Sequence, residues 1–118
     1  MQFLLLIYGN EAHWETLTKS ERQTISDEYT DFTKSIAQSR HLLGGNELKP
    51  TATATTVRVR NKKKAVTDGP FAETKEQLGG YYLVEAKDLD EAIALAARIP
   101  SARWGSIEVR PINPHEMP

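Results

Sequence analysis

The sequence contains no cysteine. Disulfide bonds, thiolate nucleophiles and zinc sites with cysteine ligands are therefore excluded. Long hydrophobic runs are also missing. The apolar stretch over residues 3–8 is too short for the hydrophobic segment of a signal peptide, and far short of the ~20 residues that a membrane span needs. We therefore expect a cytoplasmic protein with no membrane partner.

Neither sign of charge dominates the chain. It has 15 basic and 16 acidic residues and a net charge of −1, so no overall field draws it to nucleic acid. The basic run Lys62-Lys63-Lys64 has no aromatic residues between its lysines, and we interpret it as a solvated hairpin tip. His13, His41 and His115 lack paired spacing, which predicts no metal site. No phosphate loop or dinucleotide fingerprint is present, so we expect no cofactor.

The residues that are present suffice for one small domain. The 118 residues, 39% of them hydrophobic, predict a single domain over residues 1–112 and a loose C-terminal tail over residues 113–118. A core of this size is small. Pairing with a second copy would bury additional apolar surface.

Alternating patterns predict five strands. Residues 3–8 are apolar on both faces, which favours a strand in the middle of a covered sheet. Residues 53–60 and 64–68 flank a polar turn and are typical of a hairpin. Residues 81–85, again apolar on both faces, and residues 106–110 complete the set.

The first helix is predicted from a capping pattern. Residues 9–15 are expected to be a loop. Thr18 and Glu21 then have the spacing of a capping box. We expect the helix to run from about Lys19 to about Ser39 and to stop before Gly44-Gly45, because glycine favours helix ends. Its buried stripe would consist of Ile25, Tyr29, Phe32 and Ile36.

The second helix has a similar start signal. Asp88 is the expected N-cap, with Glu91 three residues further on, and Pro100 lies just past the end. The buried stripe is predicted to be Leu89, Ala92, Ile93, Ala96 and Ile99.

The resulting order β-α-β-β-β-α-β fits an α+β, ferredoxin-like sheet with one added strand. Two helices can cover only one face of such a sheet. Because the strands over residues 3–8 and 81–85 are apolar on both faces, we expect a second subunit to cover the other face. The patterning thus predicts a homodimer with a pocket between or beside the two sheets.

Several segments together resemble a known family. They are residues 3–9 (FLLLIYG), residues 52–60 (ATATTVRVR), residues 67–80 (TDGPFAETKEQLGG) and residues 109–111 (VRP). On these segments the chain resembles the DGPF branch of the YCII-related family of small bacterial proteins. The similarity extends over almost the whole chain up to Pro111, and the central motif is highly specific.

The resemblance implies a dimeric α+β barrel fold and a cytoplasmic location. Many such proteins are encoded beside sigma factors of the extracytoplasmic-function type, which makes a sigma factor a candidate partner. Some YCII-like relatives have a histidine on the first helix, paired with an aspartate, as a proposed catalytic dyad. The matching stretch here is Asp27-Glu28-Tyr29 and contains no histidine, so that dyad is not expected in this protein.

The loop after the hairpin contains most of the candidate site residues. Asp68 is the candidate general base, and Gly69-Pro70-Phe71, Glu73 and Lys75, together with Glu76, would line a substrate pocket. In the structural alternative, Asp68 hydrogen-bonds its own turn and the three charged residues after it form a solvated turn.

Arg58 is the candidate anion clamp, because its planar guanidinium matches a carboxylate or phosphate. It shares a strand face with Arg60. The alternative is an edge strand whose long cations stay in water and discourage aggregation.

Tyr8 and Tyr81, with the neighbouring Tyr82, could supply phenol donors or stacking walls; otherwise they are core or interface residues. Tyr8 comes before a glycine at a strand end and is the most pocket-like of the three. His13 is the candidate for proton transfer, because its ordinary pKa suits that role, although a lone loop histidine is usually a solvated residue.

These residues support three hypotheses. The first is a cofactor-independent small-molecule enzyme with acid/base chemistry, in which Asp68, Tyr8 and His13 handle protons and Arg58, Glu73, Lys75, Tyr81 and the Gly69-Pro70-Phe71 turn bind substrate. The second is a ligand- or protein-binding module associated with extracytoplasmic-function sigma factors. The third is a structural dimer in which the motif only shapes the fold.

Overall fold

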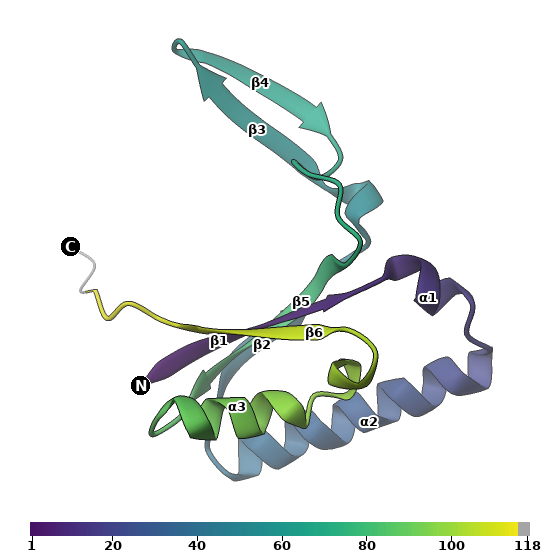
Figure 1. Ribbon diagram of the computed structural model, residues 1–118, viewed down its shortest axis with the longest axis vertical. Helices are drawn as coiled ribbons and strands as arrows, with labels where there is room; N and C mark the ends of the chain where they lie inside the picture. The colour runs from purple at the N-terminus through teal and green to yellow at the C-terminus, as the bar shows by residue number, and fades with distance from the viewer. Residues whose placement is uncertain (116–118) are drawn as a thin grey trace.

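The computed structural model describes residues 1–115 (Figure 1). Residues 116–118 of the predicted tail lie outside the described part, and residues 113–115 have no regular structure. The elements in chain order are β1 (Gln2–Gly9), α1 (Glu11–Glu15), α2 (Lys19–Gln38), β2 (Leu42–Glu47), the 3₁₀ turn η1 (Thr51–Thr53), β3 (Thr55–Arg60), β4 (Lys63–Asp68), β5 (Gln77–Glu85), α3 (Leu89–Ala97), the 3₁₀ turn η2 (Pro100–Arg103) and β6 (Ser106–Pro111).

The main sheet has four antiparallel strands in the order β2-β5-β1-β6. With two crossover helices on one face (Figure 1), this is the strand order of a ferredoxin-like fold, so the predicted α+β class is confirmed. No helix within residues 1–115 is both long enough and apolar enough to cross a membrane.

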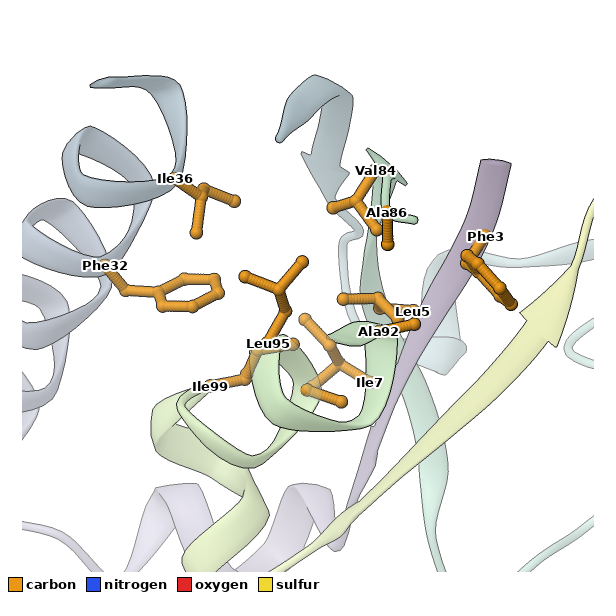
Figure 2. Close-up of a cluster of buried hydrophobic side chains, with 11 residues drawn as sticks. Phe3, Leu5, Ile7, Phe32, Ile36, Val84, Ala86, Ala92, Leu95 and Ile99 are labelled. Atoms are coloured by element: carbon orange, nitrogen blue, oxygen red, sulfur yellow. The ribbon is translucent and has the colours of Figure 1, made fainter. Parts of the chain in front are cut away.

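The core fills the space between the sheet and helices α2 and α3 (Figure 2). Phe3, Leu5 and Ile7 point to this side from β1, because alternate residues of a strand share a face. They pack against Phe32 and Ile36 of α2, so the C-terminal half of the predicted buried stripe of this helix is confirmed. Full burial of such a side chain is worth about 1.5–3 kcal/mol.

The predicted stripe of α3 is partly wrong. Ala92, Ala96 and Ile99 are buried as expected, but Leu89 and Ile93 are 50% and 49% exposed. Leu95 is buried with the first three instead. The spacing 92, 95, 96, 99 follows one face of the helix, and the two exposed residues lie on its flank.

Helix α2 begins as predicted. The Glu21 backbone N–H donates to Thr18 Oγ1 at 3.1 Å, and the Thr18 N–H donates back to Glu21 Oε1 at 3.0 Å. The predicted range of about Lys19 to about Ser39 is confirmed, because the helix ends at Gln38. The helix-ending role given to Gly44-Gly45 is wrong, since Arg40, with φ 66°, makes the left-handed turn after the helix.

Gly44 and Gly45 lie in β2, a strand that the sequence reading missed. A Cβ at Gly45 would lie 2.8 Å from the carbonyl oxygen of Tyr81 on β5, closer than real Cβ contacts allow. This glycine therefore serves close strand packing rather than helix termination. The predicted loop over residues 9–15 is also wrong in part, because Asn10 caps α1 by accepting the Ala12 N–H at 2.9 Å.

Strands β3 and β4 form the predicted hairpin, but they make a separate two-stranded sheet rather than part of the main one. We call this hairpin, residues 55–68, the arm. It rises away from the rest of the molecule (Figure 1). The radius of gyration is accordingly 16.4 Å, whereas a compact chain of this length would have about 13.5 Å. The predicted five-strand order is therefore corrected: β2 fills the place in the main sheet that the hairpin was expected to fill.

Candidate functional site

The face of the main sheet turned away from the helices is uncovered by any element within residues 1–115 (Figure 1). Strand pairing sets Leu4 beside Leu83, Leu6 beside Tyr81 and Tyr8 beside Leu78. We call these six residues the open face. Each is only partly buried. Polar residues flank this strip, with Asn46 on β2 and Ser106, Glu108 and Arg110 on β6.

Two predicted site residues therefore share one surface, because Tyr8 and Tyr81 both lie on the open face. Asn46 Nδ2 donates to the Tyr81 hydroxyl oxygen at 2.9 Å. This bond uses Tyr81 as an acceptor and leaves its O–H free to donate to a ligand. Sequence reasoning did not find Asn46, because it missed strand β2.

The DGPF loop, Asp68–Phe71, closes the root of the arm. Gly69 has φ 94°, a conformation that only glycine adopts without strain. Its N–H donates to the Ala54 carbonyl at 2.7 Å, and Thr56 Oγ1 donates to the Gly69 carbonyl at 2.8 Å. The glycine of the motif is thus required by the backbone geometry of the arm root.

The remaining loop residues are held less firmly. Arg58 Nη2 donates to the Phe71 carbonyl at 3.5 Å, a long bond that brings two predicted site residues together. Phe71 is 78% exposed. Asp68, Glu73 and Lys75 are exposed, and their side chains make no hydrogen bond or ion pair with other residues of the described range.

A carboxylate that the sequence reading missed anchors the arm root to the main body. Glu11 Oε1 accepts the Thr51 N–H at 2.8 Å, and Oε2 accepts the Thr51 hydroxyl at 2.9 Å. The Glu11 N–H in turn donates to Gln77 Oε1 at 2.9 Å. A sequence signal for this was available, since Glu11 follows the N-cap Asn10 and acidic residues favour the first turn of a helix.

His13 lies apart from the other candidates. With Trp104, Leu17, Ile25 and Glu21 it lines a shallow hollow of about 400 Å³ between α1 and α2, and no other predicted site residue lines this hollow. Its ring lies 6.1 Å from the Trp104 ring, tilted by 42°. The structure thus separates His13 from the residues of the open face.

The stretch Asp27-Glu28-Tyr29, where some relatives have a histidine, is occupied by structural contacts. Glu28 Oε1 accepts a bond from Arg103 at 2.8 Å, which lowers the pKa of that carboxyl. The Tyr29 and Ser101 hydroxyls are 2.5 Å apart, and burial raises the pKa of the Tyr29 phenol. Both contacts tie α2 to η2.

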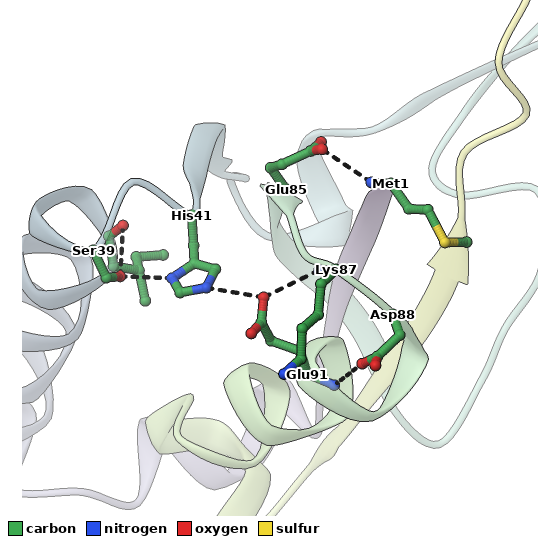
Figure 3. Close-up of polar contacts among 8 residues, drawn as sticks. Met1, Ser39, His41, Glu85, Lys87, Asp88 and Glu91 are labelled. Carbon is green, nitrogen blue, oxygen red and sulfur yellow. Dashed lines mark hydrogen bonds and ion pairs between the residues drawn. The ribbon is translucent and has the colours of Figure 1, made fainter.

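A second histidine cluster lies at the other end of α2 (Figure 3). His41 Nδ1 is 2.6 Å from Ser39 Oγ, and its Nε2 is 3.1 Å from Glu91 Oε1. The residue types are those of a hydrolase triad, but Ser39 caps the C-terminus of α2. Carbonyl oxygens gather at a helix C-terminus, where an oxyanion would need donors. We therefore interpret the cluster as structural: its contacts hold α2 and β2 against α3.

The described residues contain no group of three histidine, aspartate or glutamate side chains placed to hold a metal ion. The candidate residues thus fall into two groups, the open face with its two phenols and the DGPF loop at the arm root. The side chains of both groups can bind a ligand or transfer protons.

Comparison with known proteins agrees with the resemblance noted in the motifs. The YCII-related domain family matches residues 1–116. An uncharacterised protein of Rhizobium meliloti (strain 1021) is 35% identical over 123 residues, and the alignment covers 100% of this chain and 99% of that protein. The match extends over the arm as well as the ferredoxin-like body. The chain therefore belongs to the YCII-related family.

Proposed function

We propose that this protein is a cofactor-independent enzyme that acts on a small organic molecule by acid/base chemistry, in a site completed by a homodimer. The observation that carries the proposal is the open face, which presents leucines and two phenols and has no cover within residues 1–115. Ligand sites have this composition, mostly apolar with a few placed polar groups.

The phenols and the loop have complementary roles in this proposal. Tyr81 offers the O–H that its bond from Asn46 leaves free, and Tyr8 offers a second donor two residues from Leu6 on the same face. Asp68 is the carboxylate that accepts a proton. Arg58 has further N–H groups besides the one that reaches Phe71, and these bind an anionic group of the substrate.

A second copy would provide the burial that Asp68 lacks in the single chain. An exposed carboxylate such as Asp68 is a weak general base, because water stabilises its charged form. Burial at a dimer interface would remove that water and strengthen its interaction with a substrate proton. The proposal therefore places catalysis in the dimer.

The experiment has two stages. A panel of small metabolites is first screened by thermal shift, because a ligand that binds the folded state raises the melting temperature. Hits are then tested for turnover with the wild type, Asp68→Asn and Tyr8→Phe. We expect either substitution to lower kcat roughly 100-fold or more. Asp90→Asn, on the first turn of α3, is the matched control. Unchanged turnover in Asp68→Asn would contradict the proposed role of this carboxylate.

One observation favours a second candidate function. Phe71, the last residue of the DGPF loop, is 78% exposed, and aromatic side chains are enriched where proteins bind one another. The alternative is therefore a protein-binding module, with a sigma factor of the extracytoplasmic-function type, the partner that the family resemblance implies, as the candidate. Co-purification of that sigma factor with the wild type but not with Phe71→Ser would support it. Equal recovery with both would count against this surface.

A further inference from the structure

The arm has almost no contact with the rest of its own chain. Of residues 55–68, only Thr56 is partly buried and the others are exposed. Val57, Val59 and Val66 are 59%, 60% and 58% exposed. A two-stranded hairpin on its own is marginally stable in water. An arm with three exposed valines therefore needs a covering surface.

The three valines lie on one face of the arm. Val57 pairs with Val66, and Val59 is two residues along the same strand, so all three side chains project to the same side. Asp68 also belongs to this face, because it is two residues beyond Val66. The opposite face carries Arg58, Arg60 and Lys63. Lys64, the partner of Val59, lies on the valine face as well. One side of the arm thus presents the three valines with one lysine and one aspartate, and the other side is basic.

The arm cannot reach the open face of its own sheet. Its root is fixed by the Gly69 N–H bond to Ala54 at 2.7 Å and by the two bonds from Thr51 to Glu11. These contacts hold the arm pointing away from the main sheet (Figure 1). The covering surface must therefore come from another molecule.

Charge favours a second copy of this chain as that molecule. Residues 55–68 contain five basic residues and one acid, a formal charge of +4. Since the whole chain has a net charge of −1, the remaining residues carry −5. The body of one copy therefore attracts the arm of another. The lengths also agree, because six residues of strand span about 20 Å and a four-stranded sheet is about 15–19 Å wide.

We propose that the arm docks in trans, with its valine face packed on the open face of a second copy, and that two copies exchange arms reciprocally. This inference rests on the homodimer of the proposed function and deepens it, with one change: Arg58 lies on the opposite face of the arm and is left outside the docked site. Because Asp68 shares the valine face, the docked arm brings this carboxylate to the partner's open face, where the partner's Tyr8 lies. Each site is then built from both chains.

The first test measures dimer affinity of the full chain by sedimentation equilibrium. The triple variant Val57→Thr, Val59→Thr, Val66→Thr keeps β-branched residues, and hence strand propensity, but places hydroxyls in the contact. We expect its dissociation constant to rise roughly 100-fold or more, because six valines are buried in the exchanged dimer. Ala65→Thr, on the opposite face of the arm, is the matched control and should leave the constant unchanged.

The second test follows hydrogen exchange of the arm amides in the wild type. Docking predicts that their protection falls when the protein is diluted below its dissociation constant, while the amides of β1 and β5 stay protected. Arm amides that exchange equally fast in the dimer and the monomer would overturn the inference.

Leu6→Lys separates this inference from the proposed function. If Leu6→Lys dissociates the dimer while the triple valine variant has the affinity of the wild type, docking of the arm is wrong and the open-face dimer stands. If the wild type is a monomer throughout the micromolar range, the homodimer and the docking of the arm both fail.

Discussion

Glu11 binds Thr51 with both oxygens of its carboxylate, accepting the backbone N–H at 2.8 Å and the hydroxyl at 2.9 Å. The two residues are 40 positions apart in the sequence. Their contact joins the short helix after β1 to the turn from which the arm rises. The orientation of the arm therefore depends on a carboxylate outside the DGPF motif.

Replacing this carboxylate should loosen the arm root. Glu11→Ala removes both acceptors of Thr51, and bonds to a charged group are worth about 1.5–3 kcal/mol each at most, so we expect a loss of about 1–3 kcal/mol in unfolding free energy. Urea denaturation measures the change. Glu15→Ala, on the exposed side of the same helix, is the control. Equal losses in the two variants would mean that Glu11 has no special role.

Gly69→Ala tests the backbone requirement of the motif. A side chain at φ 94° is strained, so we expect a loss of about 1–2 kcal/mol in stability. Gly79→Ala is a matched control, because its Cβ would meet only the Ile7 carbonyl at an ordinary 3.9 Å. Thermal unfolding compares the two. An alanine at position 69 that is no worse than one at position 79 would show that the loop relaxes freely.

The contact between His41 and Glu91 predicts that the stability of the folded state changes with pH in the acid range. Bonds from the Lys87 N–H and from His41 lower the pKa of the Glu91 carboxyl in the folded state. A lowered carboxyl pKa adds stability above the pKa of the unfolded chain, about 4.3, and this contribution is lost as the pH falls through the folded value. Glu91→Gln should therefore have a lower melting temperature than the wild type at neutral pH.

The same reasoning fixes how that difference changes with pH. It should shrink as the pH falls below the pKa of the unfolded chain and vanish below the folded pKa. Asp90→Asn is the control, because the adjacent Asp90 side chain forms none of these bonds within the described residues. A difference that stays constant down to the acid limit would show that the charge of Glu91 is irrelevant.

For Tyr82 we expect the opposite pH dependence, with stability lost at alkaline pH. Burial raises the pKa of its phenol, although the bond to Thr33 opposes the shift. A raised phenol pKa gives stability that is complete below about pH 10, the unfolded value, and is lost as the pH rises through the folded value. Tyr82→Phe should lose about 1 kcal/mol at neutral pH, because it lacks the bond to Thr33.

Above pH 10 the stability of the wild type should therefore fall towards that of Tyr82→Phe, which has no phenol to ionise at this position. Thr33→Val is the comparison, because it removes the partner and keeps the buried phenol. Urea denaturation at a series of pH values measures all three. Parallel curves for the wild type and Tyr82→Phe would contradict the prediction.

Local signals in the sequence predicted the helix starts well. Thr18 with Glu21, and Asp88 with Glu91, form the expected caps, since such bonds involve neighbouring residues only. Long-range packing caused the errors. The pair Gly44-Gly45 has the composition of a helix end, yet Gly45 is needed because Tyr81 on another strand leaves no room for a Cβ.

The candidate site was predicted unevenly for the same reason. The two phenols Tyr8 and Tyr81 share one uncovered face in the structure, which depends on the pairing of β1 with β5 and was not specified by the sequence pattern. Whether Asp68 and Lys75 bind a substrate stays a prediction, because both are exposed in the single chain. His13 was placed after the correct strand, but helix α1 directs it to a different surface. Sequence spacing does not reveal where such a short helix turns the chain.

The tight bend at Asn61 and Lys62, with φ values of 52° and 64°, has a practical consequence. It lies at the tip of the arm, which contacts the domain only at its root. Changes at this tip should therefore not disturb the hydrophobic core. A fluorescent or affinity label inserted between these residues should leave the unfolding transition of the four-stranded domain intact. Such a label would report directly on whatever surface the tip meets.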